Sequence, residues 1–211
     1  AEVVPNIVDL DLFHPGSRQR PREPHLVVTR NLEAIYDNGT AIQVLALVRR
    51  SYAGARLTIC GEGPELKLLE AQARQLSLGG AVSFAGRLDR QQIAELLRDT
   101  DVLLNPSLVD NMPNSLLEAL ASGVAVVSTS VGGVPHMVQH EVSALLVPPS
   151  NPDEMARAVL RLLGDAELRE RITRTGLLGV EAFTWRRVRD RLESVYREVL
   201  AGVPAQVADA L

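Results

Sequence analysis

Residues 102–130 read VLLNPSLVDNMPNSLLEALASGVAVVSTS, and this stretch decides the fold. Its two ends, Val102–Pro106 and Val124–Ser130, are mostly apolar without alternation, which is typical of strands buried on both faces. A polar loop and a helical pattern that ends before Gly123 lie between them. A strand, a helix and a second buried strand predict a right-handed βαβ unit of a parallel sheet.

Four further apolar runs lie on either side of this unit, at His25–Thr29, Ala55–Gly61, Ala81–Gly86 and Ser143–Val147. Helical patterns alternate with these runs. Pro64 suits the first position of one helix, and Asp89 and Asn151 suit the capping positions of two others. The alternation predicts an α/β fold: a doubly wound, parallel, six-stranded Rossmann-like sheet with C-terminal helices.

The two ends of the chain differ from its middle. Residues 1–24 contain several prolines and no period, so we interpret them as a lead-in to a domain at residues 25–183. Residues 184–202 carry five arginines around an apolar stripe. This pattern predicts an amphipathic helix docked on the domain, and peripheral contact with a membrane is the alternative. Residues 203–211 are interpreted as a frayed tail.

Composition excludes several classes of protein. A chain of 211 residues with 46% hydrophobic residues is long enough to bury a core. A net charge of -4 and an aromatic content of 3% argue against a nucleic-acid binder. The single cysteine, Cys60, excludes a disulfide framework and a cysteine zinc site. With no transmembrane run and no signal peptide, we expect a cytoplasmic, soluble protein.

The loop that follows Val102–Pro106 is the strongest candidate for a functional site. Ligands of open parallel sheets bind at the carboxyl ends of the strands, and the start of a helix attracts anions. Asp110 lies in this loop, and Glu118 follows it by eight residues within the helix. Ser115 and Glu118 also match a capping box, and the local pattern alone favours that interpretation of Glu118.

Several ordered motifs carry a resemblance to a known family. Asp110 and Glu118 with seven residues between them are followed by ALASG at 119–123 and VGGVP at 131–135. VPNIVD at 4–9, LTICGEGP at 57–64 and VSFAGR at 82–87 precede them. Together, over residues 3–200, these motifs resemble the donor-binding domain of retaining GT-B glycosyltransferases. The resemblance implies that the chain is one half of a GT-B fold.

The resemblance also implies an activity for the parent protein. A hexose would pass from a UDP- or GDP-linked sugar to a hydroxyl acceptor, with retention at the anomeric carbon and without a metal or other cofactor. The acceptor domain would be a missing N-terminal half. We therefore expect this chain to bind the nucleotide sugar without turning it over. Residues 184–202 then resemble a crossover helix that packs on the missing half, which predicts an exposed apolar stripe.

Roles for individual residues follow from the resemblance. Glu118 would accept hydrogen bonds from both ribose hydroxyls, which reverses the preference for a capping role. Asp110 would hold hydroxyls of the donor sugar. The amides of Asn114, Ser115 and Leu116 would bind the diphosphate at the helix start.

Two glycine-containing segments and Arg30 complete the expected site. Residues Gly86, Arg87 and Leu88 would lie beside the base, and the Gly61 and Gly63 turn would border the donor. Arg30 would neutralise the leaving diphosphate, where positive charge is most effective.

The loop after Arg30 departs from the family pattern. It is three residues longer, and Asn38 stands where the family has lysine. Either the longer loop supplies another group, or the donor is bound with less charge stabilisation. Two rival functions stay open: a nucleotide-sugar 2-epimerase on the same fold, and a non-catalytic binding module.

Overall fold

A computed structural model of the chain describes residues 4–16 and 23–201, with side chains as far as Glu198. The predicted tail at 203–211 lies outside the described residues. All neighbouring strands pair in parallel, in the order β3-β2-β1-β4-β5-β6. The strands are β1 (His25–Thr29), β2 (Arg56–Cys60), β3 (Val82–Gly86), β4 (Val102–Asn105), β5 (Ala125–Thr129) and β6 (Leu145–Val147). The predicted six-stranded α/β fold is confirmed.

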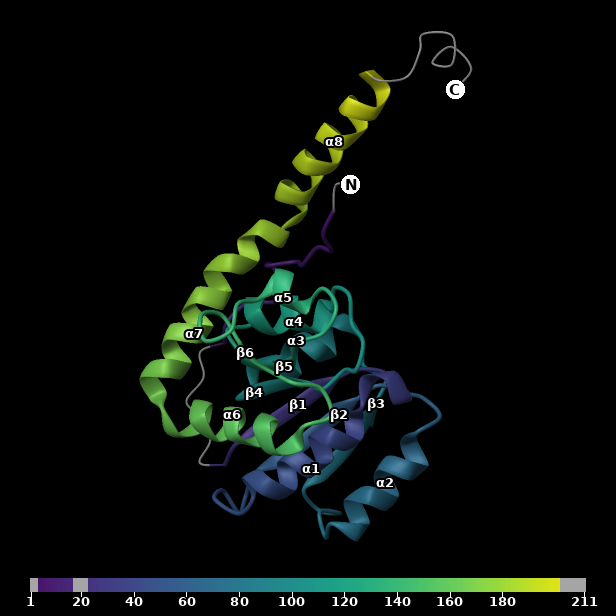
Figure 1. Cartoon of the computed structure of the whole chain (residues 1–211), viewed down its shortest axis with the longest axis vertical. Coiled ribbons are helices and arrows are strands. Elements are labelled where there is room, and N and C mark those ends of the chain that lie inside the picture. Colours follow the sequence, from purple (N-terminus) through teal and green to yellow (C-terminus); the bar gives the residue numbers. More distant parts are fainter. Residues whose placement is uncertain (1–3, 17–22, 202–211) are drawn as a thin grey trace.

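Helices cover both faces of the sheet (Figure 1). They are η1 (Ala34–Tyr36), α1 (Asn38–Val48), α2 (Leu66–Gln75), α3 (Arg90–Arg98), α4 (Asn114–Ala121), α5 (Val134–Met137), α6 (Pro152–Gly164), α7 (Ala166–Gly179), η2 (Val180–Phe183) and α8 (Trp185–Ala201). One core cluster joins the sheet to α1, α2 and α6, and a second joins it to α3 and α4. The two clusters make the sheet doubly wound.

The strands differ in how deeply they are buried. β1, β4 and β5 lie in the middle of the sheet, and their apolar side chains are buried, as continuous apolar runs predict. β3 is an edge strand, and Ser83 and Ala85 are exposed. The expectation of burial on both faces is therefore wrong for β3, because its exposed and partly buried side chains alternate and one face of the strand is open to solvent.

Two of the three predicted helix starts are confirmed. Asp89 Oδ1 accepts from the backbone N–H of Gln92 at 2.9 Å. The backbone N–H of Asp89 in turn donates to Gln92 Oε1 at 2.9 Å. Asn151 Oδ1 accepts from the backbone N–H of Glu154 at 3.0 Å. Pro64 is not the first residue of a helix, since α2 begins at Leu66 after a turn.

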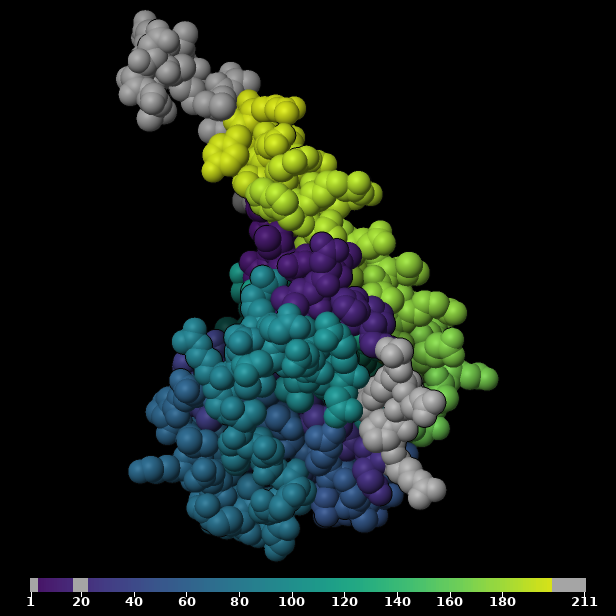
Figure 2. All heavy atoms as spheres, turned by 180° about the vertical axis from the view of Figure 1, so that it is seen from behind, coloured from purple at the N-terminus to yellow at the C-terminus, as the bar shows by residue number. Residues whose placement is uncertain are grey.

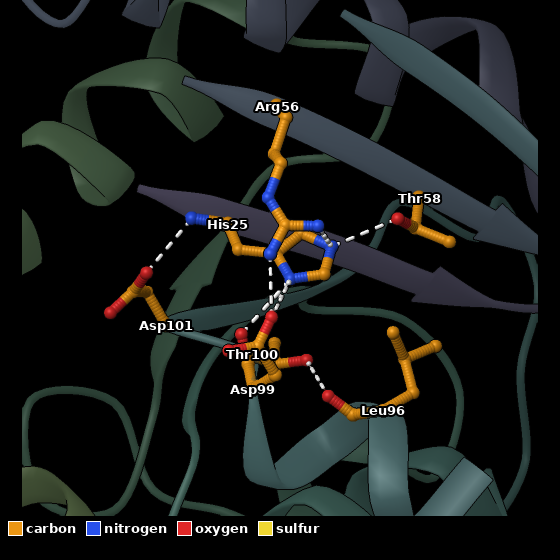
Figure 3. A network of polar contacts seen from close by, with 7 residues as sticks. All are labelled: His25, Arg56, Thr58, Leu96, Asp99, Thr100 and Asp101. Carbon is orange, nitrogen blue, oxygen red and sulfur yellow. Dashed lines mark hydrogen bonds and ion pairs between the residues drawn. The ribbon is translucent and has the colours of Figure 1, made fainter. Parts of the chain in front are cut away.

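A polar network fixes the amino ends of the central strands (Figure 3). The His25 ring donates through Nδ1 to the carbonyl of Asp99 at 2.9 Å and accepts at Nε2 from the Thr58 hydroxyl at 2.8 Å. The Asp99 carbonyl can only accept, so Nδ1 carries hydrogen, and Arg56 Nη1, a donor 3.2 Å from Nε2, favours a neutral ring that accepts at Nε2. Burial, and then the charge of Arg56, lower the pKa of His25. The network ties β1 and β2 to the turn before β4.

α8 projects away from the domain (Figure 1). Its first turn is held by Val188, which is buried, while Trp185 and Tyr196 are 55% and 61% exposed. The predicted docking of this helix on the domain is wrong, because Val188 is the only buried side chain among its described residues. The lead-in segment lies beside the base of α8 (Figure 2), where the backbone N–H of Val8 donates to the carbonyl of Phe183 at 2.9 Å.

Within residues 4–16 and 23–201, we find no helix that is both long and apolar enough to cross a lipid bilayer.

Candidate functional site

A cleft of about 230 Å³ opens at the carboxyl ends of β1 and β2. It brings together five residues predicted from the sequence: Arg30, Gly61, Arg87, Leu88 and Glu118. The sequence analysis missed four others that line it: Thr29, Asn31, Cys60 and Ile93. Thr29, Asn31 and Cys60 are sequence neighbours of predicted residues. Their position at the carboxyl ends of strands could have predicted that they line the cleft.

Glu118 reaches this cleft from the second turn of α4. Burial raises the pKa of its carboxyl group, and the charge of Arg90 opposes that shift. No hydrogen bond to its side chain is formed by any residue that the structure describes. Glu118 is partly buried, so its carboxylate is incompletely hydrated and is suited to a ligand that supplies hydroxyl donors.

The capping-box interpretation of Ser115 and Glu118 is wrong. α4 begins at Asn114, and the preceding Pro113 has no side chain that can cap it. Ser115 is thus inside the helix, and its buried Oγ has no hydrogen-bond partner. The sequence pattern gives the wrong helix start because it recognises only residues whose side chains can cap a helix, and α4 starts without a side-chain cap.

The start of α4 leaves backbone donors without acceptors inside the helix. The amides of Asn114 and Ser115 are the first two of the helix and have no acceptor within it. The Leu116 amide differs, because it donates to the carbonyl of Pro113 at 3.1 Å. Two of the three predicted amides therefore have no acceptor within the helix, as an anion site requires, and residues 114–116 are not among the residues that line the cleft.

Arg30 and Asp110, the two residues expected to contact the reacting groups, form an ion pair with each other. Their side chains are only 14% and 8% exposed. The Arg30 guanidinium also lies over the Tyr36 ring, 4.4 Å from its centroid, and its Nε has no partner. Tyr36, in η1, was missed because nothing in the local sequence marks a contact with Arg30. In the absence of a ligand, Asp110 neutralises Arg30.

Two loops of the site meet backbone to backbone. A Cβ atom on Gly132, where φ is +51°, would lie 2.0 Å from the Asp110 carbonyl oxygen. A Cβ atom on Gly133 would lie 1.9 Å from the Asn111 carbonyl oxygen, and the Gly133 amide donates to Asp110 O at 3.0 Å. Only glycine permits this approach. The loop after β5 thus fixes the position of Asp110.

The Gly61 turn supports the loop after β1 in the same way. A Cβ atom on Gly61 would lie 2.3 Å from the Arg30 carbonyl oxygen, and one on Gly63 would lie 2.3 Å from that of Leu32. Gly63 and Gly86 are not among the residues that line the cleft. The amide of Gly61 donates to the Gly86 carbonyl at 2.8 Å. Gly63 and Gly86 shape the turns beside the cleft.

Asn38, at the position of the family's lysine, is fully buried at the start of α1. Its Nδ2 donates to the Asn31 carbonyl at 2.9 Å. The longer loop is also tied to the neighbouring one, since the Leu108 amide donates to the Ile35 carbonyl at 2.8 Å. Asn38 therefore holds the loop together and supplies no charge.

A buried polar network behind the cleft was also missed. Asn105 Nδ2 donates to Ser128 Oγ at 3.0 Å, and Ser107 Oγ donates to Asn105 Oδ1 at 2.9 Å. Thr129 Oγ1 donates to the Ser107 carbonyl at 2.7 Å. These bonds fix the two loops where β4 and β5 end.

Nucleophile and metal chemistry find little support in this cleft. Burial raises the pKa of the Cys60 thiol to about 12, so it is protonated at neutral pH. In the described ranges, no three His, Cys, Asp or Glu side chains gather as metal ligands would.

Fold and cleft together define the class of doubly wound, Rossmann-like α/β domains with a ligand cleft at the carboxyl ends of the strands. The sequence model of the glycosyl transferases group 1 family matches residues 15–177. The chain belongs to this family, and its fold is that of the C-terminal domain of group 1 glycosyltransferases.

Curated relatives are named as glycosyltransferases or as glycogen synthase. D-inositol 3-phosphate glycosyltransferase of Segniliparus rotundus is 28% identical in an alignment of 213 residues, which covers 95% of this chain and 47% of the relative. Glycogen synthase of Mycobacterium tuberculosis is 32% identical over 189 residues, covering 86% of this chain and 45% of the relative. The chain thus spans less than half the length of these two proteins.

Solved structures share the fold. The C-terminal domain of a group 1 glycosyl transferase from Francisella tularensis matches with a TM-score of 0.76 at 23% identity, over 83% of this chain and 97% of that one. Anabaena HepE, solved in complex with UDP and glucose, matches with a TM-score of 0.83 at 18% identity, over 93% of this chain and 56% of that one.

Proposed function

We propose that this chain binds the nucleoside diphosphate sugar of a retaining hexosyltransferase in the cleft at the carboxyl ends of β1 and β2. The partly buried carboxylate of Glu118, which lines the cleft and is held by no hydrogen bond from a described residue, carries the proposal. A carboxylate in this position offers two acceptors to the neighbouring hydroxyls of a ribose, and charge-assisted bonds are the stronger kind. The UDP bound in the Anabaena structure of the same fold supports this choice of ligand.

The charges of the site support a leaving-group role for Arg30. The diphosphate would lie at the start of α4 and draw the Arg30 guanidinium from Asp110. Positive charge and open amides would then stabilise the negative charge that develops as the sugar leaves. Asp110, once released, would accept hydrogen bonds from sugar hydroxyls. The proposal assigns no metal ion or other cofactor to this step.

The acceptor belongs to a second part of the proposal. The relatives named above are more than twice as long as the matched region, so a further domain would supply the acceptor site. An attack on the face from which the diphosphate leaves would retain the anomeric configuration. The chain by itself would bind the donor without transferring the sugar.

Calorimetric titration of UDP, GDP and ADP into the purified chain tests the proposal. One nucleotide is expected to bind, and Glu118→Gln is expected to weaken that binding by about tenfold to a hundredfold through loss of charge-assisted bonds. Glu95→Gln is the matched control, because Glu95 is exposed on α3. Absence of binding, or equal loss in both variants, would contradict the proposal.

Asn38 favours a second candidate, a module that binds the nucleotide sugar without catalysis. Its neutral side chain is fully buried and occupied by the Asn31 carbonyl, so it contributes no charge to a leaving group. A full-length parent that binds the nucleotide but neither transfers nor hydrolyses the sugar would favour this candidate. Turnover by the parent would exclude it.

A further inference from the structure

A second cavity lies at the opposite end of the sheet, where β4 and β5 begin. Its volume is about 180 Å³, and its walls come from α3, α7, the turns before both strands, and Pro15 and Gly16 of the lead-in segment. For the residues that the structure describes, it shares no lining residue with the cleft at the carboxyl ends. The cavity is therefore independent of the proposed donor site.

Buried polar side-chain atoms without a hydrogen-bond partner fall into two groups. There are seven in the described part of the chain. Four surround the proposed donor cleft or the loop beside it: Thr29, Arg30, Asn38 and Ser115. The other three belong to residues that line the second cavity: Arg98, Ser122 and Arg169. Since buried polar groups are nearly always hydrogen-bonded, such a cluster indicates a place that a polar ligand completes.

Arg98 and Arg169 hold two guanidinium groups at this cavity. Arg98 Nη2 donates to the carbonyl of Leu12 at 3.1 Å, and Arg169 Nη1 donates to that of Leu162 at 2.7 Å. These bonds fix both side chains on backbone acceptors. Each guanidinium has five N–H donors, so both keep donors for a ligand.

Ser122 adds a hydroxyl to the same wall. The residue is 5% exposed at the end of α4, and its Oγ has no partner. The neighbouring hydroxyls are occupied, since Thr100 donates to the Leu96 carbonyl at 2.8 Å and Thr173 to that of Arg169 at 2.9 Å. The unused donors of the cavity therefore come from two arginines and one serine.

The charge and size of the cavity select the ligand. Asp101 also lines it, and its Oδ2 accepts from the His25 backbone N–H at 2.8 Å (Figure 3). Among the described lining residues, two guanidinium groups outnumber this carboxylate, so this part of the wall is net positive. The volume of about 180 Å³ is many times the roughly 10–15 Å³ that a cavity needs to hold one water molecule. A small tetrahedral oxyanion fits both properties.

We propose that this cavity binds a phosphoryl group between Arg98, Arg169 and Ser122, supplied as free phosphate or as a phosphate monoester. Guanidinium groups suit this ligand because their planar N–H pairs match oxyanion geometry. A phosphoryl group in the cavity would accept hydrogen bonds from guanidinium N–H groups that the Leu12 and Leu162 carbonyls leave unused.

Calorimetric titration of the full chain with inorganic phosphate, and separately with glycerol phosphate, tests this proposal. Arg98→Gln and Arg169→Gln are each expected to weaken binding by about tenfold or more, since each removes a charge-assisted bond. Ser122→Ala leaves both arginines in place and is expected to weaken binding severalfold, so it decides the matter if an arginine variant fails to fold. The control is Arg74→Gln, an exposed arginine on α2, with unchanged binding expected.

Backbone amide shifts in NMR spectra locate the bound ion. Phosphate is expected to shift the amides of residues 122–124, and tighter binding of glycerol phosphate would identify a monoester as the ligand. Weaker binding of glycerol phosphate would identify free phosphate. Absence of saturable binding, equal weakening in Arg74→Gln, or shifts confined to residues 114–116 would overturn the proposal.

Discussion

Replacing Gly132 by alanine tests whether the loop after β5 fixes the loop that carries Asp110. The new Cβ would lie 2.0 Å from the Asp110 carbonyl oxygen, so one of the two loops must move. A left-handed conformation costs alanine about 1 kcal/mol, and loss of the bond from Gly133 N to Asp110 O adds about 1 kcal/mol. Displacement of the Arg30–Asp110 ion pair adds to this sum, so we expect a destabilisation of about 2–3 kcal/mol.

Gly86→Ala separates the two causes. Gly86 also has a positive φ, of +67°, but a Cβ there meets nothing within 4 Å. This variant should lose only the conformational cost of about 1 kcal/mol. Urea unfolding of both variants and the parent chain gives the comparison, and nucleotide titration of Gly132→Ala should show weakened binding. Equal destabilisation in the two variants would refute the backbone contact between the loops.

Three further variants test the electrostatics of the fold and the site. Because burial raises the pKa of Glu118, the parent chain should lose stability relative to Glu118→Gln as pH rises above 4.5. In urea unfolding at neutral pH, we expect the variant to be about 0.5–1 kcal/mol more stable. A less stable variant would show that the Glu118 carboxylate has a stabilising partner. Because burial lowers the pKa of His25, the parent chain should lose stability as pH falls below 6.5, where the imidazole of the unfolded chain is protonated first. His25→Asn should flatten this dependence and lower the free energy of unfolding by about 1–3 kcal/mol at neutral pH. An unchanged pH profile would argue against a neutral His25 ring. Asp110→Asn should bind UDP more tightly in calorimetry, since its carboxylate no longer competes for Arg30; weaker binding would show that Asp110 itself supports the nucleotide.

The sequence predicts the sheet well because its information is local. Each buried strand is a continuous apolar run, and the positions of Asp89 and Asn151 mark helix starts that their own side chains form. The rule that ligands bind at the carboxyl ends of strands also places Arg30 and Gly61 in one cleft, whereas Glu118 was assigned to the site through the family resemblance. These features need no knowledge of contacts between distant residues.

What the sequence does not predict depends on contacts that are distant in the chain. Arg30 and Asp110 are 80 residues apart, and their pairing follows only from the meeting of two loops. The capping-box pattern at Ser115 fails because α4 begins at Asn114, directly after Pro113, so Ser115 already lies inside the helix. The docking of α8 was inferred from its amphipathic pattern, yet a stripe of this kind shows that a helix has a partner, not which one. Asn38 is interpreted from sequence as a missing charge, whereas the structure shows a hydrogen bond that holds a loop.

The attachment of α8 has a mechanical consequence. Its 17 residues form a rod about 25 Å long, and among its described side chains only Val188, in the first turn, is buried. A rotation of about 10° at Thr184 would carry the far end of the rod through about 4 Å, a displacement that follows from the helix rise. A small rotation of the backbone beside η2 and Val8 would therefore cause a large displacement of the Tyr196 ring. Spin labels near Tyr196 and on α1 would report that adjustment far more sensitively than any pair within the sheet.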